Sequence, residues 1–190
     1  MGPIGRAPFV LALSEMMPPG CQGVLGMDFL GHFRVDLCWS RHLMTIAEPP
    51  TSGPPARHPI NFGAAGHPFI EVLVGEPAQA LVDTGASITL VDAGGRAAHP
   101  TRFTPLGQSQ GTAAGGTQAA AAAYGLHHLS LAGHTLAPHL VAAVDLSSLD
   151  PSRRVDVLLG ATSLMQVDWR LDFPRARWDI AVPSPVGSPS

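Results

Sequence analysis

An internal repeat constrains the fold of this chain more than any other feature. The segment VLGMDFLGHFRVDLCWSRHLMTIAEP, Val24 to Pro49, aligns without a gap on LLGATSLMQVDWRLDFPRARWDIAVP, Leu158 to Pro183. Every aligned pair lies 134 positions apart, as Gly26 and Gly160 do, and eight of the pairs are identical. Because such self-similarity marks a structural unit that occurs more than once, we expect the end of one unit and then a complete second unit.

A stretch rich in Pro and Gly separates the two copies. The sequence EPPTSGPPARHP, Glu48 to Pro59, can neither continue a helix nor fill the interior of a strand. We therefore expect a partial unit over residues 1–48, a linker over residues 49–59, a complete domain over residues 60–183 and a disordered tail over residues 184–190. A length of 190 residues fits one domain and a piece of another.

Composition and charge exclude several classes of protein. The chain is 45% hydrophobic and 13% charged, which is enough apolar surface to build a core. A net charge of −3 provides no basic face for nucleic acid, and no apolar run is long enough to span a bilayer. The short apolar stretch Pro8–Leu13 lacks the length and the cleavage site of a signal peptide. We expect a soluble chain, with its compartment left open: a periplasmic or secreted location would require a start upstream of Met1.

Short apolar runs between glycines and prolines predict a mostly β domain. Strands are expected at Phe69–Gly75 and on both sides of an Asp-Thr-Gly tripeptide, and a glycine-rich hairpin over residues 107–125. Residues 127–146 favour one hairpin that turns at Ala132–His134. After Gly160 the pattern predicts one or two helical turns and then a closing hairpin. The expected architecture is all-β: a small closed barrel with one short helix.

The motif that points most directly to chemistry is LVDTGAS, Leu81 to Ser87. A strand that runs into a glycine turn presents Asp83 with little side-chain freedom, and Gly85 permits another backbone to approach closely. The second motif is VLLG, Val157 to Gly160. Its Leu-Leu-Gly segment begins at Leu158, 75 positions after Asp83.

Together these motifs resemble the retropepsin-like aspartic proteases, over about Pro68 to Ile180. In that family a D-T/S-G-A/S turn carries the catalytic aspartate, and a later hydrophobic-hydrophobic-Gly segment passes beside it before a short helix. The resemblance implies that Asp83 is catalytic. It implies supporting roles for the turn and for the second motif: Thr84, Gly85, Ala86 and Ser87, with Leu158, Leu159 and Gly160. It also implies a substrate-covering flap at Gly111, Gly115 and Gly116.

The same resemblance explains the repeat as the ending of a first lobe, so residues 1–48 are expected to be the back part of a retropepsin-like lobe. Proteases of this family use two carboxylates that share a proton. Only Asp83 fits the turn, because Asp28, Asp92 and Asp145 lack its pattern. The implied activity is therefore an aspartic endopeptidase that acts on a peptide or protein, completed by homodimerisation or by a complementary lobe, without a cofactor or metal.

Other interpretations stay open. Asp83 could be an ordinary turn residue, since Asp before Thr-Gly forms turns well. The chain could be a non-catalytic module for peptide binding or dimerisation, or a truncated and inactive product, and residues 1–48 could then pack on the second unit. The residue after Gly85 is Ala86, so no serine hydroxyl supports the carboxylate from that position. The histidines lack the spacing of metal ligands and are expected on exposed strands and loops.

Overall fold

Both copies of the repeat have the same secondary structure in the computed structural model, which describes residues 24–48, 56–112 and 118–181. The first copy contains helix α1 (Met27–Leu30) and strands β1 (Arg34–Cys38) and β2 (Leu43–Ala47). A 3-10 helix, η1 (Trp39–Arg41), connects the two strands. The second copy contains α3 (Ala161–Leu164), β14 (Asp168–Asp172) and β15 (Arg177–Ala181), each displaced by the 134 positions of the alignment.

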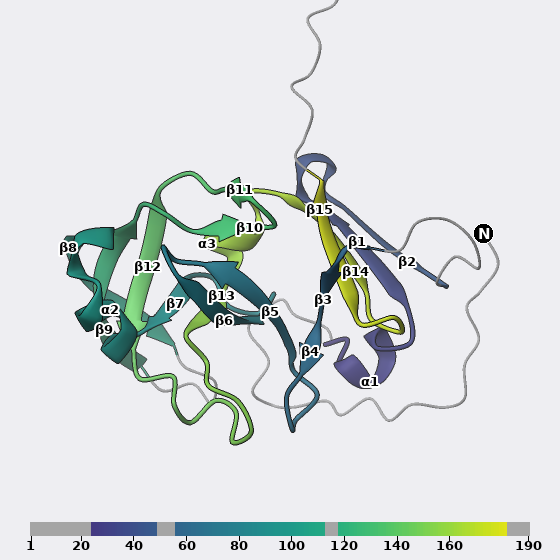
Figure 1. The fold of residues 1–190 in the computed structure, drawn as a ribbon, viewed down its shortest axis with the longest axis horizontal. Coiled ribbons are helices and arrows are strands. Elements are labelled where there is room, and N and C mark those ends of the chain that lie inside the picture. Colours follow the sequence, from purple (N-terminus) through teal and green to yellow (C-terminus); the bar gives the residue numbers. More distant parts are fainter. Residues whose placement is uncertain (1–23, 49–55, 113–117, 182–190) are drawn as a thin grey trace, which may run out of the picture.

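The two copies join in one five-stranded sheet with the order β2-β1-β14-β15-β3, in which β3 is His58–Pro59. Figure 1 shows β1 and β14 side by side in this sheet. They pair antiparallel in the register Arg34↔Asp172 to Leu37↔Trp169. Asp36 stands opposite Arg170, its own counterpart in the repeat, and the two side chains form an ion pair of 3.1 Å. A local two-fold axis therefore passes between β1 and β14.

The rest of the chain forms a ten-stranded sheet. Its order is β11-β10-β5-β6-β13-β7-β12-β9-β8, with β4 paired to β5. The strands are β4 (Asn61–Phe62), β5 (Pro68–Leu73), β6 (Pro77–Val82), β7 (Thr89–Asp92), β8 (Phe103–Thr112), β9 (Gln118–Leu126), β10 (Ser130–Leu131), β11 (His134–Thr135), β12 (His139–Val144) and β13 (Val157–Leu159). The expected mostly β fold is confirmed.

One apolar core connects the two sheets. Val35 and Leu37 of the first copy belong to the same buried cluster as Ile70, Leu159 and Trp169 of the second unit. The rings of Trp169 and Trp178 lie 5.5 Å apart at the centre of the five-stranded sheet. The first copy therefore contributes to the core of the second unit.

Three local features differ from the expectations. Residues 127–146 do not form one hairpin: β10 and β11 turn at Ala132–Gly133, but β12 pairs with β7 and β9 instead. A second helix of this unit, α2 (Ala93–Ala98), follows Asp92, whose carboxyl accepts a 3.0 Å hydrogen bond from the Gly95 amide. A 3-10 turn, η2 (Pro100–Arg102), comes next.

The expected linker is partly within the described residues, and the expected tail lies outside them. β3 lies inside the stretch expected to be linker and pairs with β15, whereas residues 49–55 and the tail at 184–190 lie outside the described part. No helix in the described ranges is long and apolar enough to cross a membrane.

Replacing Leu37 by Ala tests whether the first copy stabilises the whole protein. Leu37 is 9% exposed in the shared core, so Leu37→Ala is expected to lower the free energy of unfolding by about 2–5 kcal/mol. The matched control is Leu43→Ala on β2, where the side chain is exposed and the effect stays within about 0.5 kcal/mol. Urea unfolding followed by tryptophan fluorescence measures both variants. Equal stabilities for the two variants would contradict the shared core.

Candidate functional site

Asp83 lies at the end of β6, where β13 runs beside it. The two strands are parallel, with Leu158 opposite Leu81 and Leu159 opposite Val82. Immediately beyond this pairing, the Asp83 amide donates a 3.0 Å hydrogen bond to the Leu159 carbonyl. The backbone of Asp83 is therefore fixed by the Leu-Leu-Gly segment, although the two motifs are far apart in the sequence.

The turn after Asp83 also holds its carboxyl group. The Gly85 amide donates a 2.8 Å hydrogen bond to Asp83 Oδ1, and a side chain at Gly85 would place its Cβ only 3.2 Å from that oxygen. Asp83 is half-buried, while Thr84, Gly85 and Ser87 are exposed. The carboxyl is thus oriented by the turn and open on its other side.

A backbone crossing at Gly160 connects the turn to helix α3. The Ala86 carbonyl accepts a 2.8 Å hydrogen bond from the Ala161 amide. A Cβ at Gly160 would overlap the Ile88 carbonyl oxygen and lie 2.9 Å from the Ala86 carbonyl oxygen. Both obstacles are backbone atoms that no rotamer change can move, so this position requires glycine.

A chain of hydrogen bonds lies behind the crossing and is buried at Thr89 and Ser163. The Gly160 amide donates to Thr89 Oγ1 at 3.1 Å, and Thr89 Oγ1 lies 2.7 Å from Ser163 Oγ. Ser163 Oγ is 2.8 Å from His139 Nε2, and His139 Nδ1 is 2.8 Å from the Ala137 carbonyl. Because a carbonyl only accepts, Nδ1 carries the proton in the neutral ring and Nε2 accepts from the Ser163 hydroxyl.

This network was not expected from the sequence. His139 was grouped with exposed histidines, yet it is half-buried and bonded on both ring nitrogens. Burial lowers its pKa below the ordinary value, and the hydrogen bond with Ala137 acts in the opposite direction. A single histidine among nine, with no motif around it, carries no sequence signal for such a role.

The other aspartates that were compared with Asp83 have different surroundings. Asp92 caps α2, and Asp145 accepts a 2.9 Å hydrogen bond from the Ser147 amide. Hydrogen bonds from the Ser147 hydroxyl and, to a smaller extent, from its amide hold the pKa of Asp145 below its usual value. Asp28 lies in the first turn of α1, in the other copy of the repeat. Asp92 ends β7, which pairs with β13 in the antiparallel sense, whereas Asp83 follows β6, the strand that runs parallel to β13.

The residues expected to form a flap are described only in part. Gly111 lies in β8, which forms a long antiparallel hairpin with β9 from Phe103↔Leu126 to Thr112↔Gln118. Gly115 and Gly116 lie outside the described residues.

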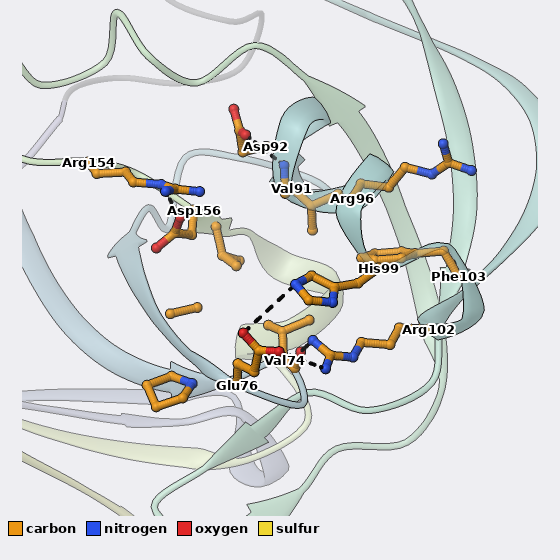
Figure 2. Close-up of a pocket in the computed structure, with 14 residues that line it drawn as sticks. Val74, Glu76, Val91, Asp92, Arg96, His99, Arg102, Phe103, Arg154 and Asp156 are labelled. Carbon is orange, nitrogen blue, oxygen red and sulfur yellow. Dashed lines mark hydrogen bonds and ion pairs between the residues drawn. The ribbon is translucent and has the colours of Figure 1, made fainter.

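A cavity of about 220 Å³ lies at the opposite end of β6 from Asp83. It is lined by the start of β6, the end of β7 and helix α2, as Figure 2 shows. Several of its ionisable side chains pair with one another: Glu76 lies 3.6 Å from Arg102 and 3.9 Å from His99, and Arg154 lies 2.6 Å from Asp156. The described residues contain no group of three His, Cys, Asp or Glu side chains that could hold a metal ion.

Substituting Gly160 tests the backbone crossing. Gly160→Ala forces the backbone of Ile88 or Ala86 to move, and overpacking of this kind costs about 1–3 kcal/mol. Gly111→Ala is the matched control, because a Cβ there meets nothing within 4 Å. Thermal unfolding followed by circular dichroism compares the two variants with the unmodified chain. The crossing is refuted if Gly160→Ala is as stable as Gly111→Ala.

The lowered pKa of His139 predicts a pH-dependent stability. The unfolded chain binds a proton at this ring more strongly than the folded chain does, so protonation favours unfolding. The free energy of unfolding should therefore fall as the pH drops through about 6.5, the ordinary histidine value, toward the lower folded pKa. In His139→Gln this part of the fall is expected to disappear.

Urea unfolding at pH 7.5, 6.5 and 5.5 measures this effect. His128→Gln, which alters an exposed ring, serves as the control and should keep the slope of the unmodified chain. An unchanged slope in His139→Gln would show that this half-buried ring does not couple protonation to folding.

Comparisons with known proteins find similarity to aspartic proteases. Residues 71–162 match a family model described as "Aspartyl protease". The matched range contains β6, the Asp83 turn, β13 and Gly160. Among solved structures, the chain is similar to a retropepsin-like aspartic protease from Rickettsia conorii, with 21% identity, a TM-score of 0.39, and coverage of 57% of this chain and 77% of that one. No curated protein matches the chain. Residues 71–162, just under half of the chain, are thus similar to the aspartyl protease family.

Proposed function

We propose that the chain supplies one half of the active site of an aspartic endopeptidase, with Asp83 as a catalytic carboxylate. The observation that carries this proposal is the placement of Asp83 in the family-matched region. Its amide is bound by Leu159 and its carboxyl by the amide of Gly85, so the side chain is held at a turn and open on one side. A preoriented and accessible carboxylate suits a group that must remove a proton from a water molecule.

The proposed reaction needs two carboxyl groups that share one proton. The ionised carboxylate removes a proton from water, whose oxygen attacks the carbonyl carbon of the peptide bond. The protonated carboxylic acid donates its proton to the carbonyl oxygen. The tetrahedral intermediate then collapses: one of its hydroxyl groups returns a proton to the second carboxylate, the bond from carbon to nitrogen breaks, and the amine leaves with the proton from the first carboxyl group. Two carboxylates held close together share a proton in this way because both cannot ionise easily.

Asp83 can fill only one of these two roles, so the second carboxylate comes from a partner. A second copy of the chain cannot pair with the edge of β14, because β1 of the same chain already occupies that edge. This occupancy favours a complementary lobe over a second copy bound through β14.

The substrate is proposed to be an extended peptide or protein segment. The hairpin of β8 and β9 is the candidate flap over that segment, because its two long strands pair along nine register positions and carry the glycine-rich sequence. Leu106 on this hairpin is 58% exposed and provides an apolar contact for a substrate side chain.

A non-catalytic module is the second candidate function. The observation that favours it is the single Asp-Thr-Gly turn of the sequence, since the partial first copy that pairs with β14 does not bring a second one. In that case the chain would bind peptides or a partner without cleaving them.

Replacing Asp83 by Asn tests the proposed role. In an assembly that supplies the second carboxylate, Asp83→Asn is expected to lower the rate of peptide cleavage at acid pH by about 10²- to 10⁴-fold, because the amide cannot exchange the proton. An inhibitor of the pepstatin type should block the unmodified protein. Cleavage of an unstructured protein substrate, measured on fractions separated by size, gives the rate for each oligomeric state.

Asp145→Asn is the matched control, since Asp145 lies in another loop and should leave the rate unchanged. Cleavage by a strictly monomeric chain would contradict the need for a second carboxylate. Peptide binding without cleavage in every oligomeric state would support the non-catalytic module instead.

A further inference from the structure

Resting on the proposed function, we propose that the first copy of the repeat presents a docking surface for a β half-lobe with the fold of residues 58–157. We define this first-copy face by Val24, Leu25, Leu30 and Met44. The proposed occupant has its own Asp-Thr-Gly turn between two strands, as Asp83 has between β6 and β7. It therefore brings the second carboxylate. The inference rests on the internal repeat. In the second copy, the residues that correspond to the first-copy face are covered by other parts of the chain.

Residues of the first-copy face are more exposed than their counterparts in the second copy. Leu25 is 46% exposed, whereas its counterpart Leu159 is fully buried between β6 and β7. Val24 is exposed while Leu158 is buried, and Leu30 is half-buried while Leu164 is buried. The buried counterparts lie in or beside β13. The front half of the second unit, residues 58–157, encloses this strand between β6 and β7.

Strand β2 shows the same difference on one of its two sides. Met44 is 44% exposed, whereas its counterpart Trp178 is 1% exposed. The neighbouring Leu43 is also exposed, but its counterpart Arg177 is exposed as well. Within the described ranges, β2 therefore differs from β15 on the side that carries Met44, where β15 is covered.

The first copy is not loosely packed as a whole. Phe33, Val35 and Leu37 are buried, as are their counterparts Val167, Trp169 and Leu171. These positions face the core that the two copies share across β1 and β14. The difference between the copies is thus confined to the face that a front half-lobe covers in the second unit.

Gly26 has the backbone conformation of Gly160 without the crossing that requires it. Its φ and ψ are −83° and 174°, and those of Gly160 are −100° and −172°. At Gly160 the backbone carbonyls of Ile88 and Ala86 exclude a side chain. At Gly26 the nearest obstacle is the movable carboxylate of Asp28, 2.5 Å from a built Cβ. A crossing backbone supplied by the occupant would account for glycine at this position.

Two polar features fit the same occupant. Asp28 takes the place of Thr162, whose Oγ1 accepts a 2.9 Å hydrogen bond from the Thr89 amide, so the Asp28 carboxylate can accept the equivalent amide hydrogen. On the outer edge of β15 lies β3, but the outer edge of β2 has no paired strand in the described part of the chain. The occupant would add the strand that corresponds to β3. It therefore begins at the position that corresponds to residue 58.

The test inserts a second copy of residues 58–157 between Gly23 and Val24 of the full chain. The inserted Val157 then precedes Val24 just as Val157 precedes Leu158. Docking is expected to slow amide hydrogen exchange of residues 24–30 about tenfold or more relative to the unmodified chain. Unchanged exchange in these residues would overturn the proposal.

Two substitutions in the insertion protein locate the contact. Met44→Asp is expected to lower its melting temperature by about 4 °C or more, and Leu43→Asp should leave it unchanged. Gly26→Ala should likewise destabilise the insertion protein and have a much smaller effect on the unmodified chain. Equal effects of Met44→Asp and Leu43→Asp would refute the docking face.

Other outcomes separate the possible occupants and the proposed function. If residues 24–30 of the unmodified chain become protected as its concentration rises, a second copy covers the face and the proposal is wrong. If the insertion protein docks its half-lobe but does not cleave peptides, the docking surface stands and the proposed catalytic function fails. Cleavage that is lost with Asp83→Asn in the insertion protein supports both.

Discussion

The antiparallel pairing of β1 with β14 is the interaction on which the arrangement of this protein depends. It joins two copies of one helix-and-hairpin unit about a local two-fold axis that passes between Asp36 and Arg170. Backbone hydrogen bonds set the register, and Val35 and Leu37 bury their side chains in the common core. The ion pair is exposed and contributes little to stability. Apolar burial therefore holds the two copies together.

The placement of Asp83 depends on a second long-range pairing. β13 lies between β6 and β7, parallel to one and antiparallel to the other. This position lets Leu159 bind the Asp83 amide, and it requires glycine at position 160 because the backbone of Ile88 crosses there. The hydrogen bonds from Thr89 through Ser163 to His139 support the crossing from behind. A change at His139 can thus reach the aspartate turn through a short chain of buried contacts.

The two copies differ in what covers them, although they share one secondary structure. Leu159 and Trp178 are enclosed by the front half of the second unit, while Leu25 and Met44 remain exposed. The same asymmetry underlies the proposed function, since one aspartate turn and one uncovered face both call for a complementary half-lobe. A half-lobe that brings a second carboxylate would satisfy both requirements with a single contact.

Much of the local structure could be predicted from the sequence, because repeats, short apolar runs and glycine turns are local signals. The gap-free alignment predicted the matching helix and hairpin of each copy, and LVDTGAS and VLLG predicted the strands around Asp83. The sequence could not predict that β12 leaves the β10–β11 hairpin for β7 and β9, or that His139 is bonded within the core. Nor could it place β1 on β14 rather than apart from it. Strand partners and burial depend on which segments meet across the core, and alternation of apolar residues along one strand does not specify the strand that will lie beside it.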